Sequence, residues 1–484
     1  MTVWVIEQKF GRRDHRHALA VLLAYTLDPK ASFDRPAYTE LRDSEIVMET
    51  SGITYLIWHD LVGITRTRGI PTKKFGDGDW PSLGWACAGQ ALTAFQDIVQ
   101  NPWGPMDEVR QVPDKSAAFE IVGQGKEHLP FKAVICDSKT AEGLDWECCG
   151  RSFLRRALND LQRETGLGIF ASFEHEFSIL GDNFAPSTPF SIAAARQQNA
   201  FLTDIEMALR HAGLSATSLE PEFGIGQYEV ACAPERDVRA ADACIMTREI
   251  IRETAIRHNI LASFTPKTDV EAVGNGAHIH LSLCDENGVN KTFDAERPMN
   301  LSKVASKFCA GVLKYLEALV AITAPTPISY HRLGPHHWSC GYKAIGLQNR
   351  EAALRIIPGI GNSDAKRRGH NIEYRPCDGT ASPYLALGVI VRAGLEGIRG
   401  EEIDLPEINE DPSEMSDVAR IKKGVSPLPE TLGAALDTLE NDKVAITWFS
   451  KNMLSTYLAL KRWEIEQATK LPAAELFDLY RTTY

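Results

Sequence analysis

Pairs of polar side chains two residues apart, set in apolar stretches, constrain the fold of this chain more than any other feature. Glu174 and Glu176 lie in the largely apolar run 168–177, and His278 and His280 follow a glycine-rich loop. Successive residues of a β-strand point to opposite faces, so residues two apart share a face. The spacing therefore predicts strands in which both carboxylates, and both imidazoles, project from one side.

Stretches with helical periodicity separate these strands. Apolar residues recurring every three to four positions predict helices over 152–165, 192–211, 240–258 and 303–320. Alternating or β-rich sequence predicts strands over 53–58, 118–122, 133–136, 168–177, 228–233 and 276–283. The Gly/Trp/Pro-rich region 76–104 predicts loops with a short helix. This mixture predicts an α+β fold.

Length and boundary signals predict three segments. The 484 residues exceed one average domain of about 100–200 residues. Pro36 ends a leading segment, and a break near residue 140 precedes the predicted helix 152–165. We therefore expect an N-terminal extension at 1–37, a small N-terminal domain at 38–140 and a larger domain at 141–484.

Composition narrows the class of protein. Asp and Glu number 64 against 52 Lys and Arg, and the net charge of −12 argues against a nucleic-acid-binding protein. The ten cysteines are scattered without zinc-finger spacing, which favours reduced thiols in a cytoplasm. No run reaches the roughly 18 apolar residues of a membrane helix, and the stretch 18–27 is not followed by a small-residue cleavage site. We expect a cytoplasmic protein that binds neither membranes nor nucleic acid.

The paired acids and histidines indicate a cation site. Two carboxylates on one strand face raise each other's pKa unless a cation lies between them, although a solvated edge strand is the alternative for Glu174 and Glu176. Glu222 and Glu229 flank a glycine-containing turn that would bring them together, although they also fit surface acids. The histidine pair favours a ligand role. An oxygen-rich set with few histidines suits Mg²⁺ or Mn²⁺ better than zinc.

Arginines cluster further along the chain, at Arg332, Arg350, Arg355 and Arg375. Hard divalent ions beside guanidinium groups are typical of phosphoryl transfer, in which both neutralise phosphate charge. Glu373 and Arg375 repeat the two-residue spacing, and an ion pair with a neighbour is the simpler interpretation of that pair. No Gly-x4-Gly-Lys-Ser/Thr segment is present, so a P-loop does not hold any nucleotide.

The order of these motifs resembles the glutamine synthetase family, from about residue 38 to about residue 400. The matching segments are Phe173–Glu176, Gly226–Glu229, Phe264–Lys267, Gly274–Leu283, Ser329–Leu333, Asn349–Arg355 and Ile372–Arg375. The resemblance implies a small β-grasp-like N-terminal domain and a large catalytic domain. It also implies a homo-oligomer of stacked, dodecamer-like rings with active sites between neighbouring subunits.

The resemblance also implies a role for each matching residue. Members of the family use ATP to phosphorylate the γ-carboxylate of L-glutamate and then let an amine attack the acyl phosphate. Two divalent ions are implied, possibly with a third; the ligands of the first would be Glu176, Glu222 and Glu229, and those of the second Glu174, His278 and Glu373. ATP would be held by His280, Ser282, Arg350 and Arg355, and glutamate by Gly274, Arg332 and Arg375. Arg332 and Arg350 would also act in catalysis.

Two departures from the family pattern concern the amine. Ammonia-using members carry an acid six positions after the arginine of the Ser-Tyr-x-Arg-Leu motif, where this chain has Trp338. Their ammonium-binding Asp-Gly-Ser-Ser segment has no clear counterpart here. An indole replaces that charge with an apolar wall, so the chain resembles the amine-ligase branch, which makes γ-glutamylamides or γ-glutamylanilides.

A bulky or aromatic amine is therefore the expected acceptor. A polyamine would call for acidic residues in the pocket. An arylamine such as aniline is mostly neutral at pH 7 and suits Trp338, with His336 or His337 taking its proton. Three alternatives stay open: Trp338 only packs the flap, the enzyme is a glutamine synthetase that uses ammonia, or the chain is a non-catalytic glutamate sensor. The complete set of metal-type and arginine residues favours an enzyme.

Overall fold

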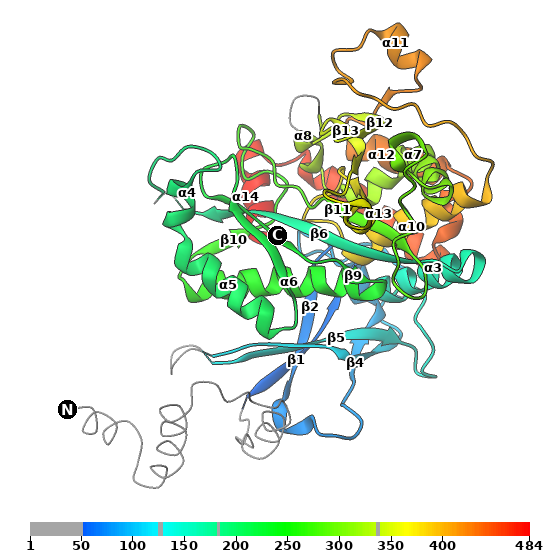
Figure 1. Ribbon diagram of the computed structural model, residues 1–484. Coiled ribbons are helices and arrows are strands. Elements are labelled where there is room, and N and C mark those ends of the chain that lie inside the picture. The colour runs from blue at the N-terminus through cyan, green and yellow to red at the C-terminus, as the bar shows by residue number, and fades with distance from the viewer. Residues whose placement is uncertain (1–51, 124–128, 182–183, 335–338) are drawn as a thin grey trace, which may run out of the picture. The chain divides into compact units, whose positions relative to one another are not determined.

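A computed structural model describes residues 52–123, 129–181, 184–334 and 339–484. The predicted extension 1–37 lies outside these residues, so the three predicted segment boundaries stay a prediction. Both helices and strands fill the described part, which confirms the α+β class (Figure 1).

A five-stranded mixed sheet forms the N-terminal part. Its strands are β1 (Ile53–His59), β2 (Thr65–Pro71), β3 (Leu83–Ala86), β4 (Glu108–Ile121) and β5 (Phe131–Lys139), in the order β2-β1-β5-β4-β3. Only the β1–β5 pair among these strands is parallel. The strands predicted at 53–58, 118–122 and 133–136 are confirmed. The prediction for 76–104 was incomplete, because this region also contains β3; its sequence, Leu-Gly-Trp-Ala, is too short to show an alternation.

A ten-stranded sheet carries the rest of the chain. Its order is β15-β12-β13-β14-β11-β6-β8-β7, with β9 and β10 also paired to β6. The strands are β6 (Gly168–Leu180), β7 (Ala216–Pro221), β8 (Gln227–Cys232), β9 (Glu235–Arg236), β10 (Leu261–Ser263), β11 (Ile279–Cys284), β12 (Tyr342–Leu347), β13 (Ala352–Ile357), β14 (Asn371–Tyr374) and β15 (Ser426–Pro427). β6 lies inside this sheet, with antiparallel neighbours on both sides. The edge-strand alternative for Glu174 and Glu176 is therefore wrong.

Helices cover this sheet and fill the C-terminal part. They are α3 (Gly150–Thr165), α4 (Ile192–Gln197), α5 (Asn199–His211), α6 (Val238–Arg257), α7 (Lys303–Thr323), α8 (Ser329–Arg332), α9 (Ser363–Gly369), α10 (Pro383–Arg399), α11 (Asp417–Lys422), α12 (Leu432–Asn441), α13 (Lys451–Ala468) and α14 (Ala473–Thr483). Short 3₁₀ turns are η2 (Thr72–Lys74), η3 (Cys87–Ala91), η4 (Pro298–Asn300) and η5 (Ala445–Trp448). The prediction of a single helix over 192–211 was wrong, because the helix is interrupted at Gln198, between α4 and α5.

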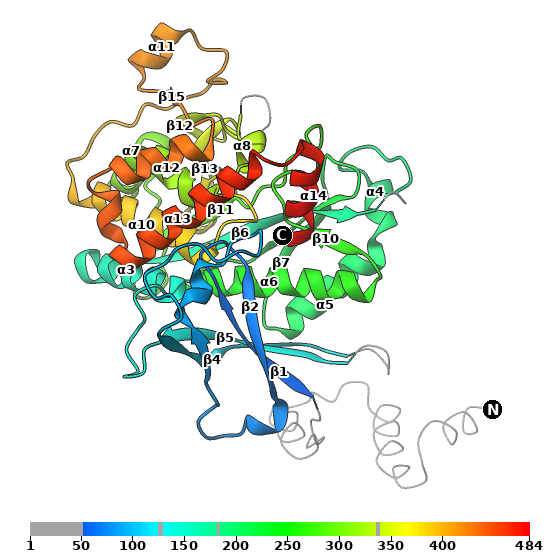
Figure 2. The same cartoon turned by 180° about the vertical axis from the view of Figure 1, so that it is seen from behind.

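The helix α7 shows how sequence sets these elements. The Ser302 hydroxyl accepts the N–H of Ala305 at 3.2 Å and so caps the first turn. Apolar residues spaced three and four apart along α7 are buried, and α7 packs against α10 (Figure 2). The two helices approach closely at Gly311, where an added Cβ would lie 2.1 Å from the carbonyl oxygen of Ala393. All ten cysteines are buried free thiols, as predicted.

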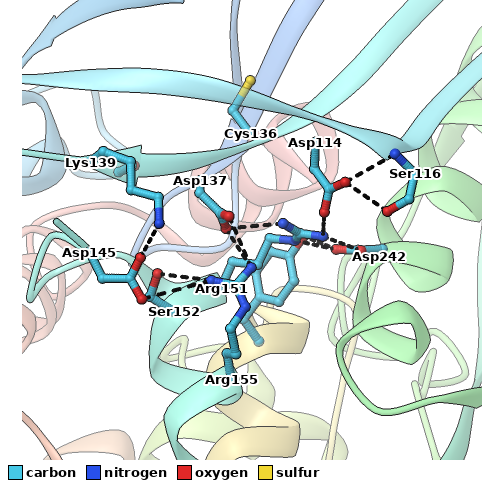
Figure 3. A network of polar contacts seen from close by, with 12 residues as sticks. Asp114, Ser116, Cys136, Asp137, Lys139, Asp145, Arg151, Ser152, Arg155 and Asp242 are labelled. Atoms are coloured by element: carbon cyan, nitrogen blue, oxygen red, sulfur yellow. Dashed lines mark hydrogen bonds and ion pairs between the residues drawn. The ribbon is translucent and has the colours of Figure 1, made fainter. Parts of the chain in front are cut away.

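A network of charged side chains joins the five-stranded sheet to the larger part. The Arg151 guanidinium on α3 lies 2.7 Å from Asp114 and 3.0 Å from Asp137, which belong to β4 and β5. It also lies 2.8 Å from Asp242 of α6, and Tyr384 of α10 donates to Asp242 at 2.6 Å. Figure 3 shows Arg151 in the middle of these three carboxylates. The network therefore fixes one sheet against the helices that support the other.

Within the described residues, no helix combines the length and the apolar character needed to cross a bilayer.

Candidate active site

Three neighbouring strands assemble the centre of the site. β11 pairs with β6 on one side and with β14 on the other, and His280 of β11 lies opposite Glu373 of β14. His278 stands just before β11, so the strand predicted from residue 276 begins only at Ile279. Its Nδ1 lies 2.8 Å from an oxygen of Glu174, and 3.7 Å from one of Glu373. Residues about 200 positions apart in the chain thus meet at one imidazole.

The Glu174–His278–Glu373 cluster has the composition of a divalent-ion site. Each residue offers one donor atom, and these atoms all lie within 4.8 Å of one another. Glu373 is 1 % exposed and His278 6 %, so water does little to screen their charges. The donor set of two carboxylates and one imidazole fits Mg²⁺ or Mn²⁺. These are the residues that the family resemblance assigns to the second ion.

A second group of acids adjoins the cluster. Glu176 of β6 lies directly opposite Glu229 of β8, and Glu222 follows β7 at the start of the turn that leads into β8. Burial, and then the charges of Glu174 and Glu176, raise the pKa of Glu229 to about 10. Burial and the charge of Glu176 raise the pKa of Glu222 to about 7. Both shifts reflect burial and the crowding of carboxylates. The surface interpretation of Glu229 is wrong, because it is 8 % exposed.

Three arginines contact the cluster. Arg355 Nη1 lies 2.9 Å from Glu373, and Arg375 also forms an ion pair with Glu373. The simple ion-pair interpretation of Glu373 and Arg375 is thus confirmed, within a larger cluster. Arg332 of α8 is 3 % exposed, and its Nη2 lies 3.1 Å from Nε2 of His278. A buried guanidinium that meets a histidine instead of an acid has charge to offer to an anionic substrate.

His280 and Ser282 lie along β11 beyond His278. Nε2 of His280 donates to Oε1 of Glu174 at 2.8 Å, and Nδ1 donates to Oδ1 of Asn371 at 2.9 Å. Burial lowers the pKa of His280, but the charges of Glu174 and Glu373 and the hydrogen bonds to Glu174 and Asn371 together raise it to about 9. The Ser282 hydroxyl donates to the carbonyl of His370 at 3.1 Å. Arg350, another of the predicted ATP residues, is exposed in the turn between β12 and β13.

The glycines at positions 274 and 276 have no side chain and so leave room for the Arg332 side chain. The N–H of Gly276 donates to Glu176 at 2.7 Å, and an added Cβ there would lie 2.7 Å from both Arg332 Nη2 and His278 Nε2. The carbonyl of Gly274 accepts from Nε2 of Gln227 at 2.8 Å. Sequence reasoning missed Gln227 as a support of this loop, although it stands inside the Gly226–Glu229 motif.

The residues predicted for the amine pocket, His336, His337 and Trp338, lie outside the described residues. Their roles stay predictions from the sequence.

Comparison with known proteins relates most of the chain to one family. The family model "Glutamine synthetase, catalytic domain" matches residues 147–480. The gamma-glutamylpolyamine synthetase GlnA3 of Streptomyces coelicolor is 31 % identical over 440 residues, covering 89 % of this chain and 93 % of the relative. The glutamine synthetase of Methanocaldococcus jannaschii is 30 % identical over 429 residues, covering 84 % and 89 %. A crystal structure described as a novel glutamine synthase homolog superposes with a TM-score of 0.80 at 35 % identity, covering 90 % of this chain and 99 % of that one.

Proposed function

Since this chain belongs to the glutamine synthetase family and is an ATP-dependent ligase, we propose that it joins the γ-carboxylate of L-glutamate to an amine larger than ammonia. The observation that carries the proposal is the buried Glu174–His278–Glu373 cluster with Arg332, Arg355 and Arg375 around it. Carboxylates facing arginines across one site suit a reaction that moves a phosphoryl group onto a second anion.

The proposed reaction has two balanced steps. A γ-carboxylate oxygen attacks the terminal phosphorus of ATP, the bond to the bridging oxygen breaks, and ADP leaves with its electron pair. The amine nitrogen then attacks the acyl carbon, the bond from that carbon to the phosphate oxygen breaks, and inorganic phosphate leaves. The amine gives up one proton, which the predicted base His336 or His337 would pass on to solvent or phosphate.

Side chains of the described site have separate proposed tasks. Arg332 and Arg375, with the backbone at Gly274, would orient glutamate, while His280, Ser282, Arg350 and Arg355 would hold ATP. Arg332 and Arg350 would also stabilise charge on the transferring phosphoryl group. Two divalent ions, Mg²⁺ or Mn²⁺, would neutralise phosphate oxygens when bound. Their proposed ligands are Glu174, His278 and Glu373 for one ion, and Glu176, Glu222 and Glu229 for the other.

The acceptor proposal rests on Trp338, where ammonia-using members have an acid. A bulky or aromatic amine, such as aniline, gains from an apolar wall that ammonium cannot use. A polyamine is the second candidate, because GlnA3 is named for γ-glutamylpolyamine synthesis. We further propose a cytoplasmic homo-oligomer of stacked rings, as the family resemblance implies.

A phosphate-release assay with an acceptor panel tests this proposal. The purified chain receives ATP, Mg²⁺ or Mn²⁺ and glutamate, with ammonium, ethanolamine, isopropylamine, a diamine, a polyamine or aniline in separate reactions. Mass spectrometry identifies each γ-glutamyl product. A higher kcat/KM for aniline or another bulky amine than for ammonium supports the proposal, and a polyamine optimum selects the second candidate. An ammonium optimum would show a glutamine synthetase, and no glutamate-dependent turnover with any acceptor would leave the sensor alternative.

A further inference from the structure

Two phenylalanine side chains stand exposed beside Glu222. Phe190 is 52 % exposed and Phe223 59 % exposed, and their ring centroids lie 6.4 Å apart at 65° between planes. Phe190 precedes α4, whereas Phe223 lies in the turn between β7 and β8. Large apolar side chains are normally withdrawn from water, so an exposed aromatic pair is a feature that a binding surface would explain.

The backbone holds this pair in place at a cost. Phe190 has φ of +56°, the left-handed region that a bulky side chain rarely adopts. Its N–H donates to the carbonyl of Glu222 at 3.5 Å, and the N–H of Phe223 donates to the Glu222 carboxylate at 3.2 Å. The backbone N–H groups of both phenylalanines thus form hydrogen bonds with the same residue, Glu222. A strained conformation that positions an exposed ring is a reason to look for function.

The turn that carries Phe223 is also linked by hydrogen bonds to the loop at Gly274. The N–H of Glu222 donates to the carbonyl of Gln227 at 2.9 Å, and the Gln227 side chain donates to the carbonyl of Gly274 at 2.8 Å. Two hydrogen bonds, from Glu222 to Gln227 and from Gln227 to Gly274, therefore link the Phe223 turn to the backbone that the proposed function assigns to glutamate binding.

We propose that Phe190 and Phe223 form an apolar wall that receives the body of the acceptor amine, with the amino group directed toward Glu222. This inference rests on the proposed function. The faces and edges of two tilted rings suit an aromatic or alkyl group. Ammonium has no such group and gains nothing from the wall, so the pair would determine acceptor specificity without acting in the chemistry.

The test compares acceptors in the full-length protein. Phe190→Ala, Phe223→Ala and the double variant are assayed by phosphate release with aniline, isopropylamine and ammonium. We expect the ratio of kcat/KM for aniline to kcat/KM for ammonium to fall about 10- to 100-fold in the double variant. Phe223→Leu, which keeps an apolar side chain, should recover part of the ratio. Ile360→Ala removes a side chain that is 90 % exposed elsewhere and should leave the ratio unchanged.

The outcomes separate this inference from the proposed function. If the wild-type protein prefers ammonium, the proposed function fails and the wall falls with it. If the wild type prefers a bulky amine and the double variant keeps that preference, only the wall is wrong. Equal losses for all acceptors, together with a smaller assembly in light scattering, would show that the pair is a contact between copies of the chain and would also overturn the inference.

Discussion

Arg332 Nη2 lies 3.1 Å from Nε2 of His278, so a guanidinium donates to the metal-type histidine. Arginine has donors only, and Nε2 must therefore accept and carry no proton. The single proton of the neutral ring then sits on Nδ1, which points at Glu174. The guanidinium of Arg332 thus sets the tautomer of His278, and the Nδ1–H donates to the Glu174 carboxylate. A cation bound at Nδ1 would replace this proton.

Replacing Glu373 should abolish turnover with every acceptor, including ammonium. Glu373 joins the cation cluster and pairs with both Arg355 and Arg375, so Glu373→Gln removes the charge with little change of shape. In the phosphate-release assay, we expect kcat/KM to fall by about 100-fold or more. Glu440→Gln, at an exposed acid on α12, is the control. Retained activity in Glu373→Gln would refute the metal assignment.

Gly276→Ala should block the site without unfolding the protein. The new methyl group would lie 2.7 Å from Arg332 Nη2 and His278 Nε2 and would push both away. A displacement of this kind should reduce kcat/KM by about 100-fold, with a melting temperature close to that of the wild type. Gly433→Ala is the matched control, because its methyl group would come no nearer than 3.8 Å to a neighbour. Similar activity in the two variants would contradict the crowded geometry.

Trp338→Glu should shift acceptor preference toward ammonium. The prediction rests on the sequence, since a carboxylate restored at this position would attract a small cation and disfavour an apolar ring. The ratio of kcat/KM for ammonium to kcat/KM for aniline should rise by about 10-fold or more. Trp338→Phe is the control, because it keeps an aromatic side chain. An unchanged ratio in Trp338→Glu would remove this residue from the amine pocket.

Arg151→Met should weaken the protein far more than Arg155→Met. The Arg151 side chain is 5 % exposed, and its loss leaves buried Asp242 without its cation, at a cost of about 3–5 kcal/mol in the free energy of unfolding. Arg155 is 30 % exposed and pairs with Asp137, so its loss should cost about 1 kcal/mol or less. Urea denaturation followed by circular dichroism measures both. Equal losses would mean that the network of Figure 3 does not hold the two sheets together.

Acid should destabilise the fold partly through His370. Burial lowers the pKa of His370 from 6.5 to about 4, and neither ring nitrogen has a hydrogen-bond partner among the described residues. Between these two pKa values, His370 is protonated in the unfolded chain but neutral in the folded one. The free energy of unfolding therefore keeps its full value above about pH 6.5 and falls, by up to about 3 kcal/mol, as the pH drops toward 4.

The variant His370→Leu isolates this contribution. It should flatten the pH dependence of the free energy of unfolding between about pH 7 and about pH 4.5, measured by urea denaturation. His211→Leu, at an exposed histidine of α5, is the control and should keep the wild-type slope. Identical slopes in wild type and His370→Leu would show that His370 does not contribute.

The sequence was sufficient to predict the site strands β6, β8 and β11, but not β13 or β14, and not the order of these strands in the sheet. That Glu174 and Glu176 share one face of the strand follows from their two-residue spacing and from strand geometry alone. That β14 would lie beside β11, with Glu373 opposite His280, depends on pairing between distant segments that no local pattern encodes. The break at Gln198 was missed for a related reason, because tertiary packing overrides helical periodicity at single positions.

The contacts of Gln227 and Asn371 were also beyond the sequence pattern. Both support other site residues through hydrogen bonds, to the carbonyl of Gly274 and to His280. An uncharged amide carries no charge or periodicity by which it could have been recognised. The family motif around Gln227 was the one available signal.

Because Glu174, His278 and Glu373 are spread over about 200 residues of the sequence, the order of synthesis limits when the site can exist. When β6 has just left the ribosome, Glu174 has been made, but His278 and Glu373 have not. Until β14 emerges, Glu174 and His278 lack Glu373, the third donor of the cluster. Strand pairings this distant close large loops and form slowly, so a nascent chain cannot bind its ions or ATP at this site before most of the protein has been made.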